Sequence, residues 1–110
     1  MVMKNLTDVR QSVTLWGKEI VIDQLEWDDY NSHHINKHAV SMIEVQESCV
    51  NQITVLSGYS GRQMLFGKTN SGRYVTVILA KQVNNIYYVV TARDTSKKER
   101  RYVYDQEKNK

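Results

Sequence analysis

Four runs rich in apolar, β-branched or aromatic residues follow one another in the second half of the 110-residue chain: 53–56, 63–68, 73–79 and 86–91. Runs of this length and composition are typical of β-strands. Residues that favour turns separate the runs at 58–61, 70–72 and 83–85. Because short turns join consecutive strands, we predict an antiparallel β-meander.

A first short helix is predicted before the meander, over residues 30–38. Asp28 is a suitable N-cap for it. Four residues recur at the spacing of one helix face: Asn31, His34, Ile35 and His38. Lys37 and His38 stand at the end of this helix, where positive charge is favourable.

A second short helix is predicted from the capping-box spacing of Ser41 and Glu44. It should run to about residue 49. Its inward side is expected to hold three apolar residues, which are Met42 or Ile43, Val45 and Cys49.

The N-terminal part has a weaker pattern. Residues 1–11 show no clear period, and we expect them to be frayed. Residues 12–22 contain two apolar runs around Gly17 and Lys18, which favours a β-hairpin. A single strand followed by a loop is the alternative interpretation.

A second capping box, formed by Ser96 and Glu99, predicts a C-terminal helix that begins at Lys97. The chain is therefore predicted to be a single α+β domain over residues 1–110, since its length suits one domain. Short N-terminal helices would pack on an antiparallel meander that leads into a C-terminal basic helix. Residues 1–24 would be an extension to a core over residues 25–104.

Charge adds a feature that the hydrophobic pattern does not show. The net charge is only +3, but its placement is uneven. Residues 93–110 hold seven Lys or Arg against four Asp or Glu, whereas residues 1–92 hold eight of each. A basic helix on a neutral body indicates either a phosphate-binding surface or a solvated helix face.

Composition excludes several classes of protein. The chain is 41% hydrophobic and 25% charged, has no apolar run near the length of a membrane span and shows no signal-peptide core. Its one cysteine, Cys49, suits a reducing cytoplasm and a place in the core, and no second cysteine supports a zinc site. Glycine-rich phosphate loops and common hydrolase motifs are absent, so we expect a cytoplasmic protein without a metal or other cofactor.

Five short motifs then occur in order over residues 25–104. They are Glu26-Trp27-Asp28, Asn36 to Ser41 with Glu44, Ser71-Gly72-Arg73, Thr91-Ala92-Arg93, and Ser96 to Arg100 with Tyr102. Together they resemble the BrnT family of bacterial type II toxins. That family has a Trp-Asp start, a Lys-His-Gly-Val-Ser segment, a Gly-Arg before a hydrophobic strand and an Ala-Arg…Lys-Lys-Glu-Arg end.

The resemblance implies a compact RelE-like fold and a metal-independent endoribonuclease that poisons translation. It also implies a small ribbon-helix-helix antitoxin as partner, in a complex that represses its own operon, with a homodimer or a heterotetramer as the assembly. The sequence departs from the family pattern at Ala39, which stands in place of Gly, at Asp94, where a basic residue is common, and in the extension over residues 1–24. Ala39 would be strained if the helix ends in a left-handed conformation.

Metal-free RNA cleavage needs a base for the 2′-hydroxyl, an acid for the leaving oxygen and cations for the phosphate. Arg93, at the end of the last predicted strand, is the first candidate for gripping a phosphate. An ion pair with Asp94, Asp28 or Asp29 is the alternative. Arg73 could be a second clamp or a solvated strand end.

His38 could act as an acid or a base near neutral pH, or could cap the first helix. His33 and His34 are weaker candidates. His34 and His38 share a face, but no carboxylate or cysteine completes a metal site there.

Glu99 could be a general base, but its place in the capping box also explains it. Under the family resemblance, the following residues would contact RNA: Lys37, Lys97, Lys98, Arg100, Arg101 and Tyr104, whose ring could stack on a base. A solvated helix face is the alternative for the cations of the last helix, and Tyr102 could belong to the core or to the site. A non-catalytic module that binds nucleic acid or an antitoxin, and a purely structural partner protein, remain rival functions.

Overall fold

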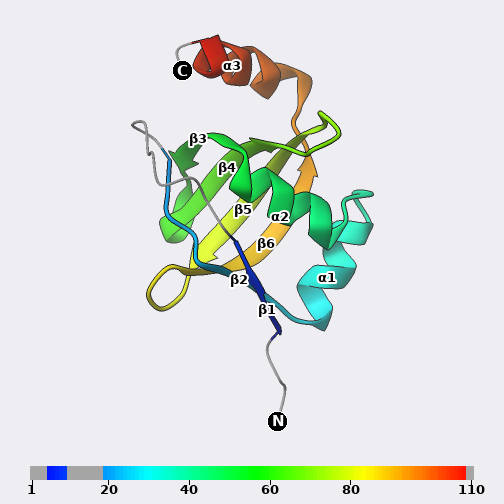
Figure 1. The fold of residues 1–110 in the computed structure, drawn as a ribbon, viewed down its shortest axis with the longest axis vertical. Helices are drawn as coiled ribbons and strands as arrows, with labels where there is room; N and C mark the ends of the chain where they lie inside the picture. The colour runs from blue at the N-terminus through cyan, green and yellow to red at the C-terminus, as the bar shows by residue number, and fades with distance from the viewer. Residues whose placement is uncertain (1–4, 10–18, 109–110) are drawn as a thin grey trace.

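Six strands form one mixed β-sheet in the order β1-β2-β6-β5-β4-β3 (Figure 1). The computed structural model describes residues 5–9 and 19–108. Its strands are β1 (Asn5–Asp8), β2 (Gln24–Trp27), β3 (Gln52–Ser57), β4 (Arg62–Lys68), β5 (Tyr74–Lys81) and β6 (Ile86–Asp94). Its helices are α1 (Asp29–Asn36), α2 (Met42–Val50) and α3 (Lys97–Lys108), with a helical turn, η1 (Tyr59–Gly61), between β3 and β4.

The strands β3 to β6 form the predicted antiparallel meander, each pairing with the next. The prediction that the sheet is only a meander is wrong, because β2 pairs with β6 in parallel and β1 pairs with β2. The α+β class is confirmed, with a mixed sheet in place of an antiparallel one.

The two missed strands carry little sequence signal. β1 has one apolar residue, Leu6, and its side chain is 45% exposed. In β2, Leu25 and Trp27 are buried, but the strand has only four residues and acidic neighbours on both sides. Backbone pairing to β6 places β2 in the sheet. The expectation that residues 1–11 are frayed is therefore wrong for residues 5–8, and the predicted turn at Gly17 and Lys18 lies outside the described residues.

The helices α1 and α2 cover one face of the sheet, as the ribbon shows (Figure 1). The predicted N-caps are both present. The Asp28 carboxylate accepts the Asn31 N–H at 2.9 Å, and the Ser41 hydroxyl accepts the Glu44 N–H at 3.1 Å. Asn31 is fully buried and donates its side-chain amide to the carbonyls of Glu26 at 3.0 Å and Val89 at 2.9 Å. This one side chain therefore joins α1 to β2 and β6.

The inward side of α2 differs in part from the prediction. Val45 and Cys49 are fully buried as expected, but Met42 is 38% exposed and Ile43 is 66% exposed. The third inward residue is Ser48, because α2 lies directly on Gly67 of β4. A Cβ atom at Gly67 would come within 2.0 Å of the Ser48 carbonyl oxygen.

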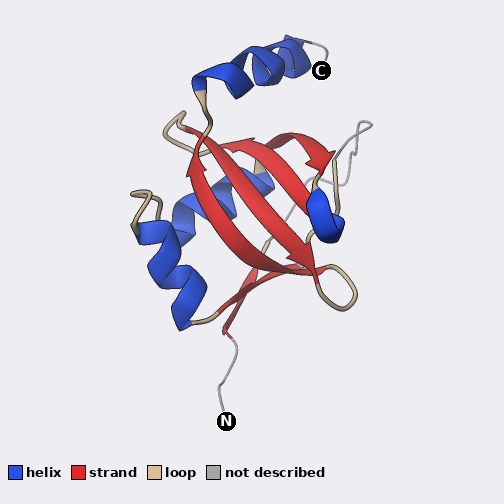
Figure 2. Cartoon of the chain, turned by 180° about the vertical axis from the view of Figure 1, so that it is seen from behind, coloured by secondary structure: helices blue, strands red, loops and turns tan. Residues whose placement is uncertain are grey.

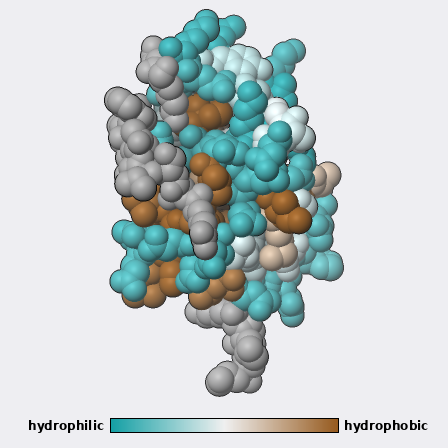
Figure 3. All heavy atoms as spheres, in the orientation of Figure 1, coloured by the Kyte–Doolittle hydropathy of each residue, from teal (hydrophilic) through white to brown (hydrophobic). Residues whose placement is uncertain are grey.

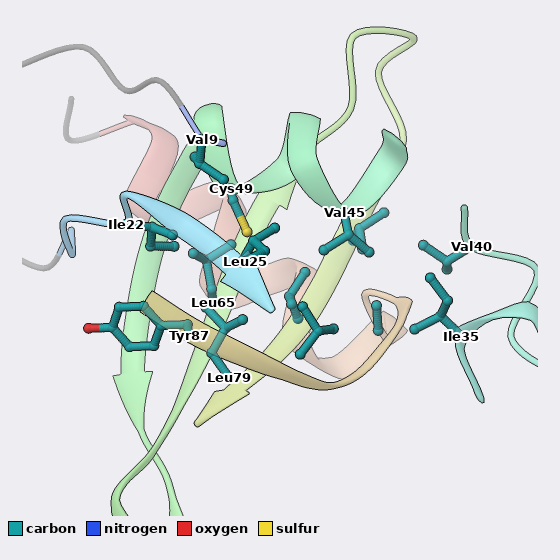
Figure 4. Packing of buried hydrophobic residues seen from close by; sticks show 14 of the residues in the cluster. Val9, Ile22, Leu25, Ile35, Val40, Val45, Cys49, Leu65, Leu79 and Tyr87 are labelled. Carbon is teal, nitrogen blue, oxygen red and sulfur yellow. The ribbon is translucent and has the colours of Figure 1, made fainter. Parts of the chain in front are cut away.

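The main core lies between the sheet and the helices α1 and α2 (Figure 4). Cys49 belongs to this core, as predicted, and burial raises the pKa of its thiol to about 12. A space-filling view of this face shows apolar patches between hydrophilic side chains (Figure 3).

A second, smaller cluster lies on the other face of the sheet. There Val103 of α3 packs against Ile53 and Phe66, with Tyr102 beside them. A bulge in β3 places both Ile53 and Thr54 toward α3, and the Thr54 hydroxyl lies 3.2 Å from the Tyr102 hydroxyl. Tyr102 therefore contributes to the core. In the described part of the chain, no helix is long and apolar enough to cross a membrane.

The contact between α2 and Gly67 can be tested by Gly67→Ala. The added methyl group must push the α2 backbone away from the sheet, so we expect a loss of about 3 kcal/mol in the free energy of unfolding, measured by urea denaturation. Gly58→Ala is the matched control, because a Cβ atom there meets only Arg62 at 3.5 Å or more. Equal stabilities of the two variants would contradict the close contact between Gly67 and the backbone of α2.

Candidate nucleic-acid interface

The last two residues of β6 point to opposite faces of the sheet. Asp94 lies opposite Val75, which belongs to the core under α1 and α2. Arg93 lies opposite Thr76, which bonds to Thr95 at 3.0 Å on the other face. Arg93 and Asp94 therefore belong to different sites.

On the face of α1 and α2, Arg73 joins three parts of the chain. Its guanidinium donates to Asp94 at 2.7 Å, to both oxygens of Glu44 at 3.1 and 3.0 Å, and to the carbonyl of Ala39 at 2.8 Å. Ala39 has a φ of 57°, so the strained left-handed turn expected from the sequence is present and is held by this hydrogen bond.

These contacts also change the acidity of the carboxyl groups of Asp94 and Glu44. Arg73 lowers the pKa of Asp94, and the Ser41 backbone, followed by Arg73, lowers the pKa of Glu44. With three acceptors, the guanidinium of Arg73 is committed to holding the α1–α2 turn against the sheet.

On the opposite face, Arg93 forms a two-pronged ion pair with Glu99 of α3. The nitrogen–oxygen distances are 2.7 and 2.9 Å. Glu99 also accepts the Ser96 N–H at 2.9 Å, so it completes the predicted capping box. Arg93 and then Ser96 lower the pKa of Glu99 to about 2. The partner of Arg93 is thus a carboxylate that the sequence suggested only as a cap or a base.

None of the three carboxylates suggested as alternative partners of Arg93, all of which lie in the described part of the chain, forms an ion pair with it. Asp94 binds Arg73, and Asp28 accepts a hydrogen bond from the Tyr88 hydroxyl at 3.0 Å. Asp29 lies in the first turn of α1.

The start of α3 presents a group of exposed cations, Lys97, Lys98, Arg100 and Arg101. Within residues 5–9 and 19–108, none of these four forms an ion pair. Arg100 donates to the carbonyl of Thr95 at 3.2 Å. The other three line a hollow of about 660 Å³. Their charges add to the positive end of the helix dipole, which suits an anion.

Tyr104 lies further along α3 and is 44% exposed. Its ring meets the ring of Tyr74 edge to face, with centroids 5.4 Å apart. The Tyr74 hydroxyl donates to Glu107 at 2.7 Å. The contact with Tyr74 holds Tyr104 beside the end of the sheet, with its side chain partly exposed.

The sheet face next to α3 is mostly uncovered. Figure 2 shows it from the side away from α1 and α2, where among the described elements only α3 at one end and η1 at one side lie over it. Arg93 therefore stands where an uncovered sheet surface meets the cations of α3.

The predicted histidines and Lys37 lie elsewhere, on and after α1. Tyr30, His34 and His38 form a row of rings with centroid distances of 6.0 and 5.4 Å. Lys37 and His33 line a hollow of about 410 Å³ beside that row. Because α1 covers the face opposite to Arg93, the structure brings Arg93 together with Glu99 but not with His38 or Arg73.

In the part of the chain that the structure describes, no group of three or more His, Cys, Asp or Glu side chains could hold a metal ion. Comparisons with protein-family models, with curated proteins and with solved structures found no match.

The ion pair of Arg93 predicts a pH-dependent stability. The pKa of Glu99 falls from 4.5 to about 2 on folding, so the stabilisation is complete above about pH 4.5 and is lost as the pH falls toward 2. At neutral pH we expect Arg93→Gln to lower the free energy of unfolding by about 2 kcal/mol, after allowance for solvent screening. Near about pH 2, where Glu99 is protonated, we expect a much smaller loss.

Urea denaturation across this pH range measures the effect. Arg62→Gln is the control, because Arg62 is exposed and forms no ion pair among the described residues. If the loss in the free energy of unfolding for Arg93→Gln stays constant with pH, the ion pair of Arg93 with Glu99 does not lower the pKa of Glu99.

Proposed function

We propose that this chain binds RNA through α3 and the sheet surface beside it, and acts as a toxin endoribonuclease of the BrnT type. One observation carries the proposal. Exposed cations at the positive end of α3 stand next to an arginine held at the end of a strand, on a sheet face that no other described helix covers. Phosphate groups are the natural ligands of such a surface.

The order of the elements supports a RelE-like fold as part of this proposal. Two short helices precede a four-stranded meander and lie on one face of it, and a basic helix follows the last strand. The motifs that resemble the BrnT family lie over residues 26–102, within β2 to α3.

The chemistry assigned to the site is attack of the RNA 2′-hydroxyl on the adjacent phosphate, in which the bond from the 2′-oxygen to phosphorus forms and the bond to the 5′-oxygen breaks. Glu99 accepts the proton of the 2′-hydroxyl, and the leaving 5′-oxygen takes up a proton from water. Arg93 and the α3 cations would stabilise the charge on the five-coordinate phosphorus. Glu99, with a pKa of about 2, is a weak base while Arg93 holds it. A phosphate that takes over Arg93 removes the largest cause of this low pKa, so Glu99 becomes a stronger base when RNA is bound.

This assignment places Glu99 ahead of His38 as the base. His38 lies on the side of α1, across the sheet from Arg93. Arg73 acts in this proposal as a structural clamp, since its guanidinium already has three protein acceptors.

A cytoplasmic toxin of this type would be neutralised by a small ribbon-helix-helix antitoxin. A reading frame for such a protein next to the gene, and its co-purification with this chain as a heterotetramer, would support the assignment.

A second candidate is a non-catalytic module that binds RNA or an antitoxin. The specific observation in its favour is the two-pronged pairing of Arg93 with Glu99, which neutralises the guanidinium that would act on the phosphate.

Phosphate binding by α3 can be measured on the triple variant Lys97→Gln, Lys98→Gln, Arg101→Gln. For single-stranded RNA we expect the slope of log affinity against log salt to fall by about 2, since three phosphate contacts are lost. Fluorescence anisotropy measures this slope. Lys81→Gln, an exposed cation on the other sheet face, should leave it unchanged. An unchanged slope in the triple variant would remove α3 from the interface.

Cleavage separates the two candidates. Purified wild-type protein should fragment RNA and leave 2′,3′-cyclic phosphate ends, and its expression should arrest bacterial growth. Glu99→Gln keeps an acceptor for the Ser96 N–H, so it should retain folding and RNA binding but reduce cleavage by about 10²-fold or more. Intact RNA with folded wild-type protein, together with harmless expression, would exclude the enzyme and leave the binding module.

A further inference from the structure

Four residues form a row across the uncovered sheet face, one from each strand of the meander. Strand register places Leu56 opposite Met64, Met64 opposite Ile78, and Ile78 opposite Thr91. Leu56 is 36% exposed, and Met64 and Ile78 are half-buried. Because three of its four side chains are apolar, this row is a largely apolar surface on the side of the sheet away from the main core.

Basic residues flank this row on both sides, along the direction of the strands. Arg93 lies on one side, opposite Thr76, beside the cations of α3. Arg62 lies on the other, opposite Ala80. Its side chain is exposed and forms no hydrogen bond or ion pair with another described residue. Thr76, Ile78 and Ala80 alternate with core residues along β5, so both arginines belong to the same face.

An exposed aromatic ring lies next to Arg62. Tyr59 of η1 is 93% exposed. Hydrogen bonds close its loop, from the Gly58 N–H to the Arg62 carbonyl at 2.7 Å and from the Arg62 N–H to the Tyr59 carbonyl. Figure 2 shows η1 on the uncovered side of the sheet. The loop therefore presents a ring and a cation together.

From this arrangement we propose a second anchor for single-stranded RNA at Tyr59 and Arg62, so that the strand crosses the uncovered face from α3 to η1. Arg62 binds a phosphate, Tyr59 stacks on a base, and the apolar row lies under the nucleotides between the anchors. The inference rests on the proposed RNA-binding function and names the path of the ligand.

The distance between Arg93 and Arg62 suits a short stretch of single-stranded RNA. The positions of Arg93 and Arg62 are four residues apart along β5 and two strands apart across the sheet. With about 3.4 Å per residue and about 4.8 Å between strands, their Cα atoms are about 17 Å apart. A flexible strand can lie flat over this distance, whereas a base-paired helix cannot place bases on the sheet.

The distribution of charge defines the course of the RNA across the sheet and favours RNA over an acidic peptide as the ligand. The far edge of this face carries Asp28, which accepts from Tyr88, so a polyanion is directed over β4 and β5. An acidic peptide would satisfy the arginines, but it offers no planar base for the exposed ring of Tyr59. The combination of cations, an apolar row and an exposed ring is that of a nucleic-acid stacking surface.

The test is anisotropy with a labelled single-stranded oligoribonucleotide of about 10 nucleotides. Its riboses carry 2′-O-methyl groups, so that attack by the 2′-hydroxyl cannot occur. Arg62→Gln should lower the salt slope of binding by about 0.7, the value for one phosphate contact. Tyr59→Ala should weaken binding about tenfold, as expected for one stacked base.

Lys81→Gln is the matched control for Arg62→Gln. Lys81 is exposed, follows Ala80 on β5 and belongs to the opposite face, since it pairs with the core residue Tyr87. Its loss removes the same charge at the same level of the sheet and should not alter the slope. Tyr59 and Arg62 are both exposed, so equal urea midpoints will show that their variants remain folded.

The outcomes separate this inference from the function on which it rests. If wild-type protein binds the oligonucleotide and the α3 triple variant weakens binding, but Arg62→Gln and Tyr59→Ala bind like wild type, the second anchor is overturned and the proposed function stands. The same holds if Lys81→Gln lowers the slope as much as Arg62→Gln. If folded wild-type protein does not bind RNA at all, the proposed function and the anchor fall together.

Discussion

The register of the last strand is the constraint on which the candidate site depends. β6 contains a bulge, so that Val89 lies opposite Leu79 while Thr91 lies opposite Ile78. The extra residue reverses the faces of every later position of β6. Without it, Arg93 would lie opposite Val75 and point into the core under α2. With it, Arg93 reaches the uncovered face and Asp94 takes the place beside Arg73.

This division assigns the carboxylates to two different arginines. Asp94 and Glu44 hold Arg73, which fastens the α1–α2 turn to the end of the sheet. Glu99 holds Arg93 at the start of α3. The exposed cations of α3 have no such partners within the described residues, so the positive charge of the C-terminal segment is available to a ligand. The charge is concentrated where a strand end, a helix N-terminus and a bare sheet surface meet.

Local patterns predicted much of the fold. The predicted N-cap at Asp28 and the two predicted capping boxes at Ser41 and Ser96 are present, because these hydrogen bonds involve residues only three positions apart. The four meander strands are present for a similar reason, since turns connect neighbours in sequence. β1 and β2 were missed because each has only four residues. The place of β2 depends on pairing with a strand about 60 residues later, at Leu25 and Tyr87, and β1 in turn pairs with β2. The prediction of which residues of α2 face inward was partly wrong, because the close contact of α2 with Gly67 buries Ser48 and leaves Met42 and Ile43 exposed.

By itself the sequence determined the identity of the candidate groups: a basic C-terminal helix capped by Glu99, an arginine at the end of a strand, and short helices before a meander. Each of these follows from residue types and short spacings. Only the tertiary structure decided which of the groups meet. Arg73 precedes a strand and Arg93 ends one, so the sequence offered both as strand-end candidates. The bulge in β6 places Arg93 on one face of the sheet and Asp94, the partner of Arg73, on the other. Arg62 and Tyr59 carried no motif, and only the strand register shows that Arg62 and Arg93 belong to the same face of the sheet. Such relations depend on long-range pairing, which no short segment encodes.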